Sequence, residues 1–264
     1  AMTSSFHGRT IGALSVGSNK KYKSNIGPVP GKVKFCKFND VSHLKKLVNK
    51  KTVAIIIEFV QGDGGINICS KNFAKAIKGI CKNKKILLIG DEIQGGIGRT
   101  GKIFAYKHYG VNPDIITSAK GLGSGIPIGA TIVKKYISKI ISTGFHGSTF
   151  GGGMLQTRVS YNVFKTINTK RFLNKVLING NLLSSLIKKM HHLHKDKIVD
   201  TRCLGLMAGV EFKNNQIALK TYEKMSKNGL ISTLIQGNII RLTPPLTVST
   251  GEIRKAIKII TQSL

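Results

Sequence analysis

Two residues capable of covalent and acid–base chemistry follow two short apolar runs of the sequence. Asp91 comes soon after the run 86–89, and Lys120 follows the run 114–117, in a loop rich in glycine. Apolar runs of this length are typical of buried strands in a parallel sheet. Ligands of open α/β sheets bind beyond the carboxyl ends of the strands. We therefore expect the carboxylate and the amine to reach one crevice.

A carboxylate and an amine in one crevice suit a ligand that carries a basic ring nitrogen and an aldehyde. Pyridoxal phosphate has both groups: a lysine bonds to its aldehyde carbon, and an acid pairs with the pyridinium nitrogen. We therefore predict that Lys120 and Asp91 hold this cofactor and are the catalytic residues. The alternative for Lys120 is an ordinary solvated lysine, since the chain has 42 lysine and arginine residues. Its glycine-rich loop after a buried strand favours the cofactor position.

Four short motifs occur in order around these two residues. They are DEIQ at 91–94, GRTG at 98–101, SAKG at 118–121 and GSTFGG at 147–152. In this order and at these spacings, they resemble the signature of class-III aminotransferases that depend on pyridoxal phosphate. Within that class the chain is most similar to acetylornithine aminotransferases. The resemblance implies an α/β fold of type I: a mostly parallel sheet flanked by helices, with a small α+β C-terminal domain.

The resemblance also implies roles for other residues at the cofactor. The family's aromatic residue at the position of Phe6 lies on the face of the pyridine ring, and Gln94 corresponds to a residue that contacts the ring's phenolic oxygen. Thr149 corresponds to a threonine that binds the cofactor phosphate of the neighbouring subunit, which implies a homodimer with composite active sites. The expected cofactor-binding set is completed by Asp91, Glu92 and Lys120.

A further set of residues is implied to bind substrate. Arg9 and Arg241 correspond to arginines that bind substrate carboxylates, a role that suits the planar fork of donors on a guanidinium. Arg241 is expected to bind the α-carboxylate of glutamate. Ser148 would lie near the substrate. The family usually has Glu-Pro-x-Gln-Gly-Glu where this chain has Glu58 to Asp63, and one of these two acids would pair with a mobile arginine between half-reactions.

The motifs together predict an aminotransferase that moves an amino group between N-acetylornithine and 2-oxoglutarate. Other class-III enzymes, acting on ornithine, succinylornithine or 4-aminobutyrate, share the motifs and stay open, as does a truncated, non-catalytic remnant. The chain begins where the family's large domain is already under way, so we expect the N-terminal part of the family fold to be absent. Residues 1–165 are expected to form a partial cofactor-binding domain and residues 166–264 the small domain.

Hydrophobic periodicity predicts the elements that must position these residues. Strand, helix and strand over 53–59, 72–82 and 86–89 give the alternation of a parallel sheet. Further helices are expected over 41–49, 158–169, 174–194, 218–226 and 251–264. A strand and then a helix are expected over 132–141, a strand pair over 198–212 and another strand through 239–240.

The net charge of +31 would suit a nucleic-acid-binding protein. However, the lysines are spread along the whole chain, arginine is scarce and Trp is absent, so few base-reading or stacking groups are available. Nucleic-acid binding is therefore unlikely as the main function. Acids are rare by contrast, and five of the eleven lie between positions 58 and 114, around the predicted site.

The remaining features predict a cytoplasmic protein without metal. Four cysteines are scattered with no CxxC pair, which favours reduced thiols over a zinc site or a disulfide framework. His191, His192 and His194 point to different faces of an expected helix, so no metal site is predicted there. No apolar run is long enough to span a bilayer, and the first ten residues lack the pattern of a secretory signal.

Overall fold

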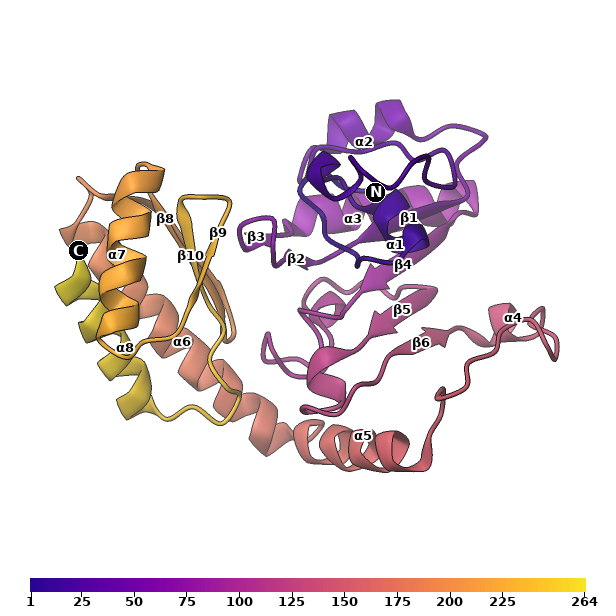
Figure 1. Ribbon diagram of the computed structural model, residues 1–264. Helices are drawn as coiled ribbons and strands as arrows, with labels where there is room; N and C mark the ends of the chain where they lie inside the picture. The colour runs from indigo at the N-terminus through magenta and orange to yellow at the C-terminus, as the bar shows by residue number, and fades with distance from the viewer.

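The computed structural model describes residues 1–264 and contains two four-stranded sheets, each packed against its own helices (Figure 1). The N-terminal sheet has the strand order β1-β4-β5-β6. Its strands are β1 (Ala54–Ile57), β4 (Leu87–Asp91), β5 (Ile115–Ser118) and β6 (Ala130–Val133). The first three run parallel and β6 runs antiparallel to β5, which gives the expected mostly parallel sheet.

The register of the parallel strands brings their carboxyl ends to one edge. Ile57 lies opposite Gly90, and Asp91 lies opposite Thr117. The residues that follow these positions, including Glu58 and Lys120, therefore emerge at the same edge of the sheet.

Helices α2 (Val41–Leu47) and α3 (Lys71–Lys84) cover this sheet. The hydroxyl of Ser70 caps α3 by accepting the amide of Phe73, and the helix buries a stripe of Phe73, Ala74, Ile77 and Cys81. The N-terminal segment adds α1 (Ile11–Val16) and the short 3-10 turn η1 (Lys20–Tyr22). Two more 3-10 turns, η2 (Ala105–His108) and η3 (Lys120–Leu122), follow β4 and β5.

The C-terminal sheet is entirely antiparallel, in the order β7-β8-β10-β9. Its strands are β7 (Ile198–Leu204), β8 (Met207–Phe212), β9 (Thr233–Ile235) and β10 (Ile239–Leu242). Three helices, α6 (Lys170–Leu193), α7 (Asn215–Lys227) and α8 (Thr250–Ser263), pack on one face and enclose the larger of the two main cores (Figure 1). The other face lies toward a hairpin of β2 (Val60–Gln61) and β3 (Asn67–Ile68).

Helix α6 packs backbone to backbone against the turn between β7 and β8. A Cβ on Gly180 would lie 2.5 Å from the carbonyl oxygen of Gly205, and a Cβ on Gly205 would lie 2.5 Å from the carbonyl carbon of Thr100. Gly205 also has φ +58°, a backbone conformation that residues other than glycine rarely adopt. These two glycines therefore allow α6, the 205 turn and the GRTG loop to stack without intervening side chains.

Most of the predicted elements are present, but α5, α6 and the hairpin differ from expectation. Helix α6 begins at Lys170, four residues before its predicted start. Helix α5 (Met154–Ile167) begins four residues earlier than predicted, because its first residues carry exposed apolar side chains and give no amphipathic signal. The β2–β3 hairpin was expected only as a turn, since each of its strands has two residues. Helix α5 leads from the N-terminal sheet to α6, and the segment after α4 (Lys135–Ser138) extends away from the sheet (Figure 1). No helix combines the length and the apolar character needed to cross a lipid bilayer.

Candidate active site

Lys120 stands at the start of η3, immediately beyond β5. Its backbone has φ +49°, which is rare for a residue with a side chain. No hydrogen bond or ion pair joins this amine to another group of the chain, and it lines a cavity. Burial lowers the pKa of the Lys120 amine, while the nearby charges of Asp63, Asp91 and Glu58 act to raise it. The predicted lysine and acid therefore share one electrostatic environment.

The carboxylate of Asp91 is held on both oxygens. The Nδ1 of His7 lies 2.6 Å from Oδ2, and Oδ1 accepts the hydroxyl of Thr117 and the amide of Ile93, each at 3.1 Å. An ionised carboxylate can only accept, so the His7 Nδ1–H donates. Both side chains are buried, and the Nε2 of His7 has no partner. Sequence reasoning missed His7, although it stands between the two residues of the SFHGR segment that were assigned roles.

Two further acids near these strand ends are almost completely buried. Glu58 accepts the amides of Phe6 and Gly62, and burial raises its pKa from 4.5 to about 8, helped by the charges of Asp91 and Asp63. Burial also raises the pKa of Glu92, to about 7.

Glu92 is not among the residues that line the Lys120 cavity. Its carboxylate accepts the amides of Ala105 at 2.7 Å and Tyr106 at 2.8 Å, so it orders the loop after the GRTG motif. Both oxygens of Glu92 therefore already bind backbone amides, and its expected place among the cofactor ligands stays a prediction.

The β2–β3 turn and β10 bring Asp63 and Arg241 together across 178 residues of sequence. Arg241 Nη1 lies 2.7 Å from Asp63 Oδ1, and Gln94 Nε2 donates to Asp63 Oδ2 at 3.2 Å. Of the two acids expected to meet an arginine, Asp63 is the one that does so. The Arg241 Nε is buried without a partner, which leaves a donor of the guanidinium unused.

The N-terminal segment contributes an aromatic and cationic cluster. The rings of Phe6 and Tyr22 meet edge to face at 5.9 Å, and the Arg9 guanidinium lies over the Tyr22 ring at 3.9 Å. The Phe6 amide donates to Glu58, so this segment is tied to the end of β1. Tyr22 was not predicted to take part.

Ser148 and Thr149 lie on the exposed segment between α4 and α5 and are not among the residues that line the Lys120 cavity. The structure therefore does not bring them together with Lys120 of the same chain. This separation is compatible with the role that the resemblance implies for them, in the site of a neighbouring subunit.

A cavity of about 770 Å³ extends from Lys120 toward α5 and β10. Its charged lining consists of Lys120, Arg241 and Arg99, with no acid. Arg99 Nη1 donates to the carbonyl oxygens of Leu206 and Pro244, and burial lowers the pKa of its guanidinium to about 10. The cavity thus favours a ligand that carries negative charge.

The residues present fit pyridoxal phosphate. The Lys120 amine is unbonded and its pKa is lowered, as bonding to an aldehyde requires. Asp91 is a buried, oriented acid, and the hydroxyl of Ser118, two residues before Lys120, is buried without a partner. The donor set therefore offers an amine and an acid, together with a polar group that nothing in the chain satisfies.

A family model described as Aminotransferase class-III matches residues 1–264, the whole chain. The chain belongs to the class-III aminotransferases. Ornithine aminotransferase 1 of Staphylococcus saprophyticus is 39% identical over 266 residues, covering 100% of this chain and 66% of that relative. Acetylornithine aminotransferase of Methanocaldococcus jannaschii is 40% identical over 257 residues, covering 96% of this chain and 63% of that relative.

The solved structures similar to this class-III aminotransferase include the ornithine aminotransferase of Toxoplasma gondii. It has a TM-score of 0.94 and 29% sequence identity, and the match covers 99% of this chain and 63% of that one. The expected fold class is confirmed. The chain spans about two thirds or less of the length of these relatives.

Proposed function

We propose that the protein is an aminotransferase dependent on pyridoxal phosphate, with Lys120 as the residue that bonds the cofactor. The observation that carries this proposal is the Lys120 amine, which follows β5 on a left-handed backbone turn, forms no hydrogen bond or ion pair and lies within the electrostatic reach of Asp91. Lysines with this combination of strain, burial and missing partners concentrate at functional sites.

Lys120, Asp91 and Phe6 would hold the cofactor in this chain, and Thr149 would contact its phosphate from the neighbouring subunit. When bound, pyridoxal phosphate supplies an aldehyde that captures an amino group and a ring that accepts the electron pair released when a proton leaves the substrate carbon. Asp91 would accept the hydrogen bond of the protonated ring nitrogen, while His7 fixes the orientation of the carboxylate.

Lys120 would also move the proton. A lowered pKa keeps a larger share of its amine neutral near pH 7, so the amine can accept a proton from the carbon that bears the substrate's amino group. The same side chain can return that proton to a neighbouring atom, because no bond to the protein restrains it.

The substrate carboxylate would bind Arg241. Asp63 occupies this guanidinium in the free protein, so an incoming carboxylate must displace Asp63. Arg9 would receive a second carboxylate. These cations suit glutamate and 2-oxoglutarate as one substrate pair, and the relatives named acetylornithine aminotransferase favour N-acetylornithine and its semialdehyde as the other. Ornithine is the second candidate donor, favoured by the relative named ornithine aminotransferase 1.

We further propose a cytoplasmic homodimer with composite sites. The segment from Tyr136 to Tyr161 presents several exposed apolar side chains that a second copy would cover, among them Phe145, Phe150 and Met154. All four cysteines are free thiols, as suits a reducing compartment.

The test is a titration of the purified protein with pyridoxal phosphate, followed by visible absorption. A band characteristic of cofactor bonded to lysine should develop in the wild type, change on addition of glutamate and be absent in Lys120→Ala. Lys255→Ala, which removes an exposed lysine of α8, is the matched control and should behave as the wild type. A band of equal strength in Lys120→Ala would contradict the assignment. Steady-state rates with N-acetylornithine, ornithine, succinylornithine and 4-aminobutyrate then rank the amino donors.

A further inference from the structure

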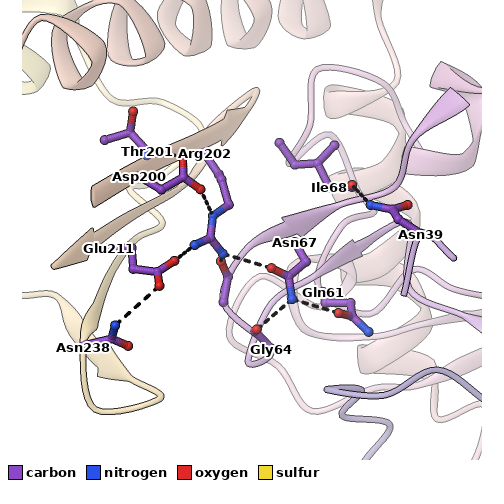
Figure 2. A network of polar contacts seen from close by, with 11 residues as sticks. Asn39, Gln61, Gly64, Asn67, Ile68, Asp200, Thr201, Arg202, Glu211 and Asn238 are labelled. Carbon is purple, nitrogen blue, oxygen red and sulfur yellow. Dashed lines mark hydrogen bonds and ion pairs between the residues drawn. The ribbon is translucent and has the colours of Figure 1, made fainter. Parts of the chain in front are cut away.

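Arg202 of β7 is the centre of a polar network between the C-terminal sheet and the β2–β3 hairpin (Figure 2). Its Nε donates to Asp200 at 2.7 Å, and its Nη2 pairs with Glu211 of β8. Its Nη1 reaches across to the hairpin, where it donates to the carbonyl oxygen of Gly65 at 2.6 Å and to the side chain of Asn67 at 2.9 Å. All three nitrogens of the guanidinium are therefore engaged.

The two acids orient the guanidinium. Asp200 and Glu211 lie opposite each other in the β7–β8 register, and both pair with the Arg202 guanidinium. They are two of only eleven acids in the chain, against 42 basic residues. With Nε and Nη2 held by these acids, the planar fork presents Nη1 to the hairpin.

Hydrogen bonds of the hairpin connect Arg202 to the N-terminal segment. Asn67 donates to Gln61 and to the carbonyl oxygen of Gly64, and the fully buried Gln61 donates to the carbonyl oxygen of Thr3. The network therefore continues from Arg202 through the hairpin into the N-terminal segment that carries Phe6 and His7.

The turn itself, residues 62–65, is held at both ends by the C-terminal sheet. Gln236 donates to the carbonyl oxygen of Asp63 at 2.7 Å, and Arg202 donates to that of Gly65. The turn is also tightly enclosed, because a Cβ on Gly64 would lie 2.3 Å from the carbonyl oxygen of Ser4. Asp63 is thus held through its own carbonyl oxygen and lies two residues before Gly65, with its carboxylate on Arg241.

We propose that Arg202 is a positioning residue that fixes the 62–65 turn on the C-terminal sheet and so sets how strongly Asp63 competes with a substrate carboxylate for Arg241. The proposal rests on the proposed function, in which Arg241 binds that carboxylate. Arg202 touches neither substrate nor cofactor; it acts through the Gly65 carbonyl and Asn67. When the turn is released, the Asp63 side chain samples more positions, and it pairs with Arg241 in a smaller fraction of them. A larger fraction of Arg241 is then free, and the apparent affinity for a carboxylate rises.

The first measurement is amide hydrogen exchange of the turn, which needs neither cofactor nor turnover. In Arg202→Met, peptides covering 60–68 should exchange about tenfold faster than in the wild type, while peptides covering β4 and β5 stay unchanged. Arg202→Lys keeps the charge but cannot form the whole fork, so it should lie in between. Arg254→Met removes an exposed arginine of α8 and is the matched control. Unchanged exchange at 60–68 in Arg202→Met would overturn the proposal.

The second measurement is the dissociation constant of glutarate, a dicarboxylate without a transferable amino group, by calorimetry on protein saturated with pyridoxal phosphate. Arg202→Met should lower it by about fivefold, and Asp63→Asn by at least as much, since each frees Arg241. In the double variant, Arg202→Met should add nothing, because the competing carboxylate is already gone. An equal effect of Arg202→Met with and without Asp63 would refute the positioning role. If Asp63→Asn alone leaves glutarate binding unchanged, the proposed competition at Arg241 is wrong, and the exchange measurement alone decides whether Arg202 holds the turn.

Discussion

Asp91 is fully committed to the protein before any ligand binds. Its two oxygens take three hydrogen bonds, and the shortest comes from a histidine that is buried with it. A carboxylate held in this way keeps its orientation at little further entropic cost when a cationic ring nitrogen meets it. At the scale of single residues, His7 is therefore as important for the site as the acid that it holds.

Replacing His7 with Phe removes the donor to Asp91 while keeping a ring in the pocket. Hydrogen bonds to charged groups contribute about 1.5–3 kcal/mol, which corresponds to a roughly ten- to hundredfold loss in affinity for pyridoxal phosphate. The measurement is an absorbance titration of the cofactor. His192→Phe, at an exposed position of α6, serves as the control. Unchanged cofactor affinity in His7→Phe would show that Asp91 does not depend on this bond.

Glu58 gives the folded protein a pH dependence of known sign. Its pKa is raised from 4.5 in the unfolded chain to about 8 in the folded one, so between these values the unfolded state is ionised while the folded state keeps the proton. Stability is then lost as the pH rises through this window, by as much as about 1.4 kcal/mol per pH unit. In Glu58→Gln this contribution disappears. Urea denaturation of both proteins at pH 5, 6, 7 and 8 should show a shallower decline for the variant, and parallel declines would mean that Glu58 titrates normally.

Lys120 and Asp91 could be predicted to lie at neighbouring strand ends from local sequence patterns. In each case the pattern is a short apolar run followed by a glycine or a polar residue. The Asp63–Arg241 pair and the Arg99 contacts could not be derived from local patterns, since they join residues more than 100 positions apart. Resemblance supplied the expectation that an acid meets an arginine, and the geometry identifies the acid as Asp63.

At the scale of elements, local periodicity predicts a helix but not what its glycines do. Helix α3 contains Gly79 and helix α6 contains Gly180. In sequence, each is a glycine inside an amphipathic helix, and nothing local distinguishes them. A Cβ on Gly79 meets nothing within 4 Å, whereas one on Gly180 would run into the backbone of Gly205. The difference depends on a contact between segments that are distant in sequence, so the pattern of either helix alone cannot show it.

Alanine at these two glycines should therefore have opposite effects on stability. Gly79→Ala should raise the free energy of unfolding by up to about 1 kcal/mol, because alanine is the better helix former. Gly180→Ala should lower it by about 1–3 kcal/mol or more, since the helix must move away from a backbone that cannot yield. Chemical denaturation of both variants beside the wild type gives the two signs directly. A stabilised Gly180→Ala protein would contradict the close packing of α6 on the 205 turn.

At the scale of the whole molecule, polar contacts of three arginines join the C-terminal part to the rest of the chain. Arg202 and Arg241 reach from the C-terminal sheet to the β2–β3 hairpin and its turn, and Arg99 reaches from the GRTG loop to the carbonyl oxygen of Pro244. In a chain with so few acids, these contacts account for three of them, Asp63, Asp200 and Glu211. Three of the eleven acids thus pair with arginines of the C-terminal sheet, whereas the Lys120 amine forms no ion pair.

The exposed position of Thr149 leads to a prediction about two chains rather than one. If Thr149 completes the site of a partner, Lys120→Ala and Thr149→Ala should each be nearly inactive, but their mixture should recover activity. A mixed dimer has one site with the intact Lys120 of one chain and the intact Thr149 of the other, and a second site that lacks both. Random pairing makes half of the dimers mixed, so the mixture should reach about a quarter of wild-type activity.

A chain that carries both substitutions is the matched control, because mixing it with either single variant leaves every site short of at least one residue. Refolding the chains together allows exchange of subunits, and sedimentation shows that dimers have formed. Activity of the Lys120→Ala and Thr149→Ala mixture no higher than that of the separate variants, in the presence of mixed dimers, would mean that Thr149 serves its own chain. The exposed loop would then have to fold back toward Lys120, which its distance from the cavity lining in this structure argues against.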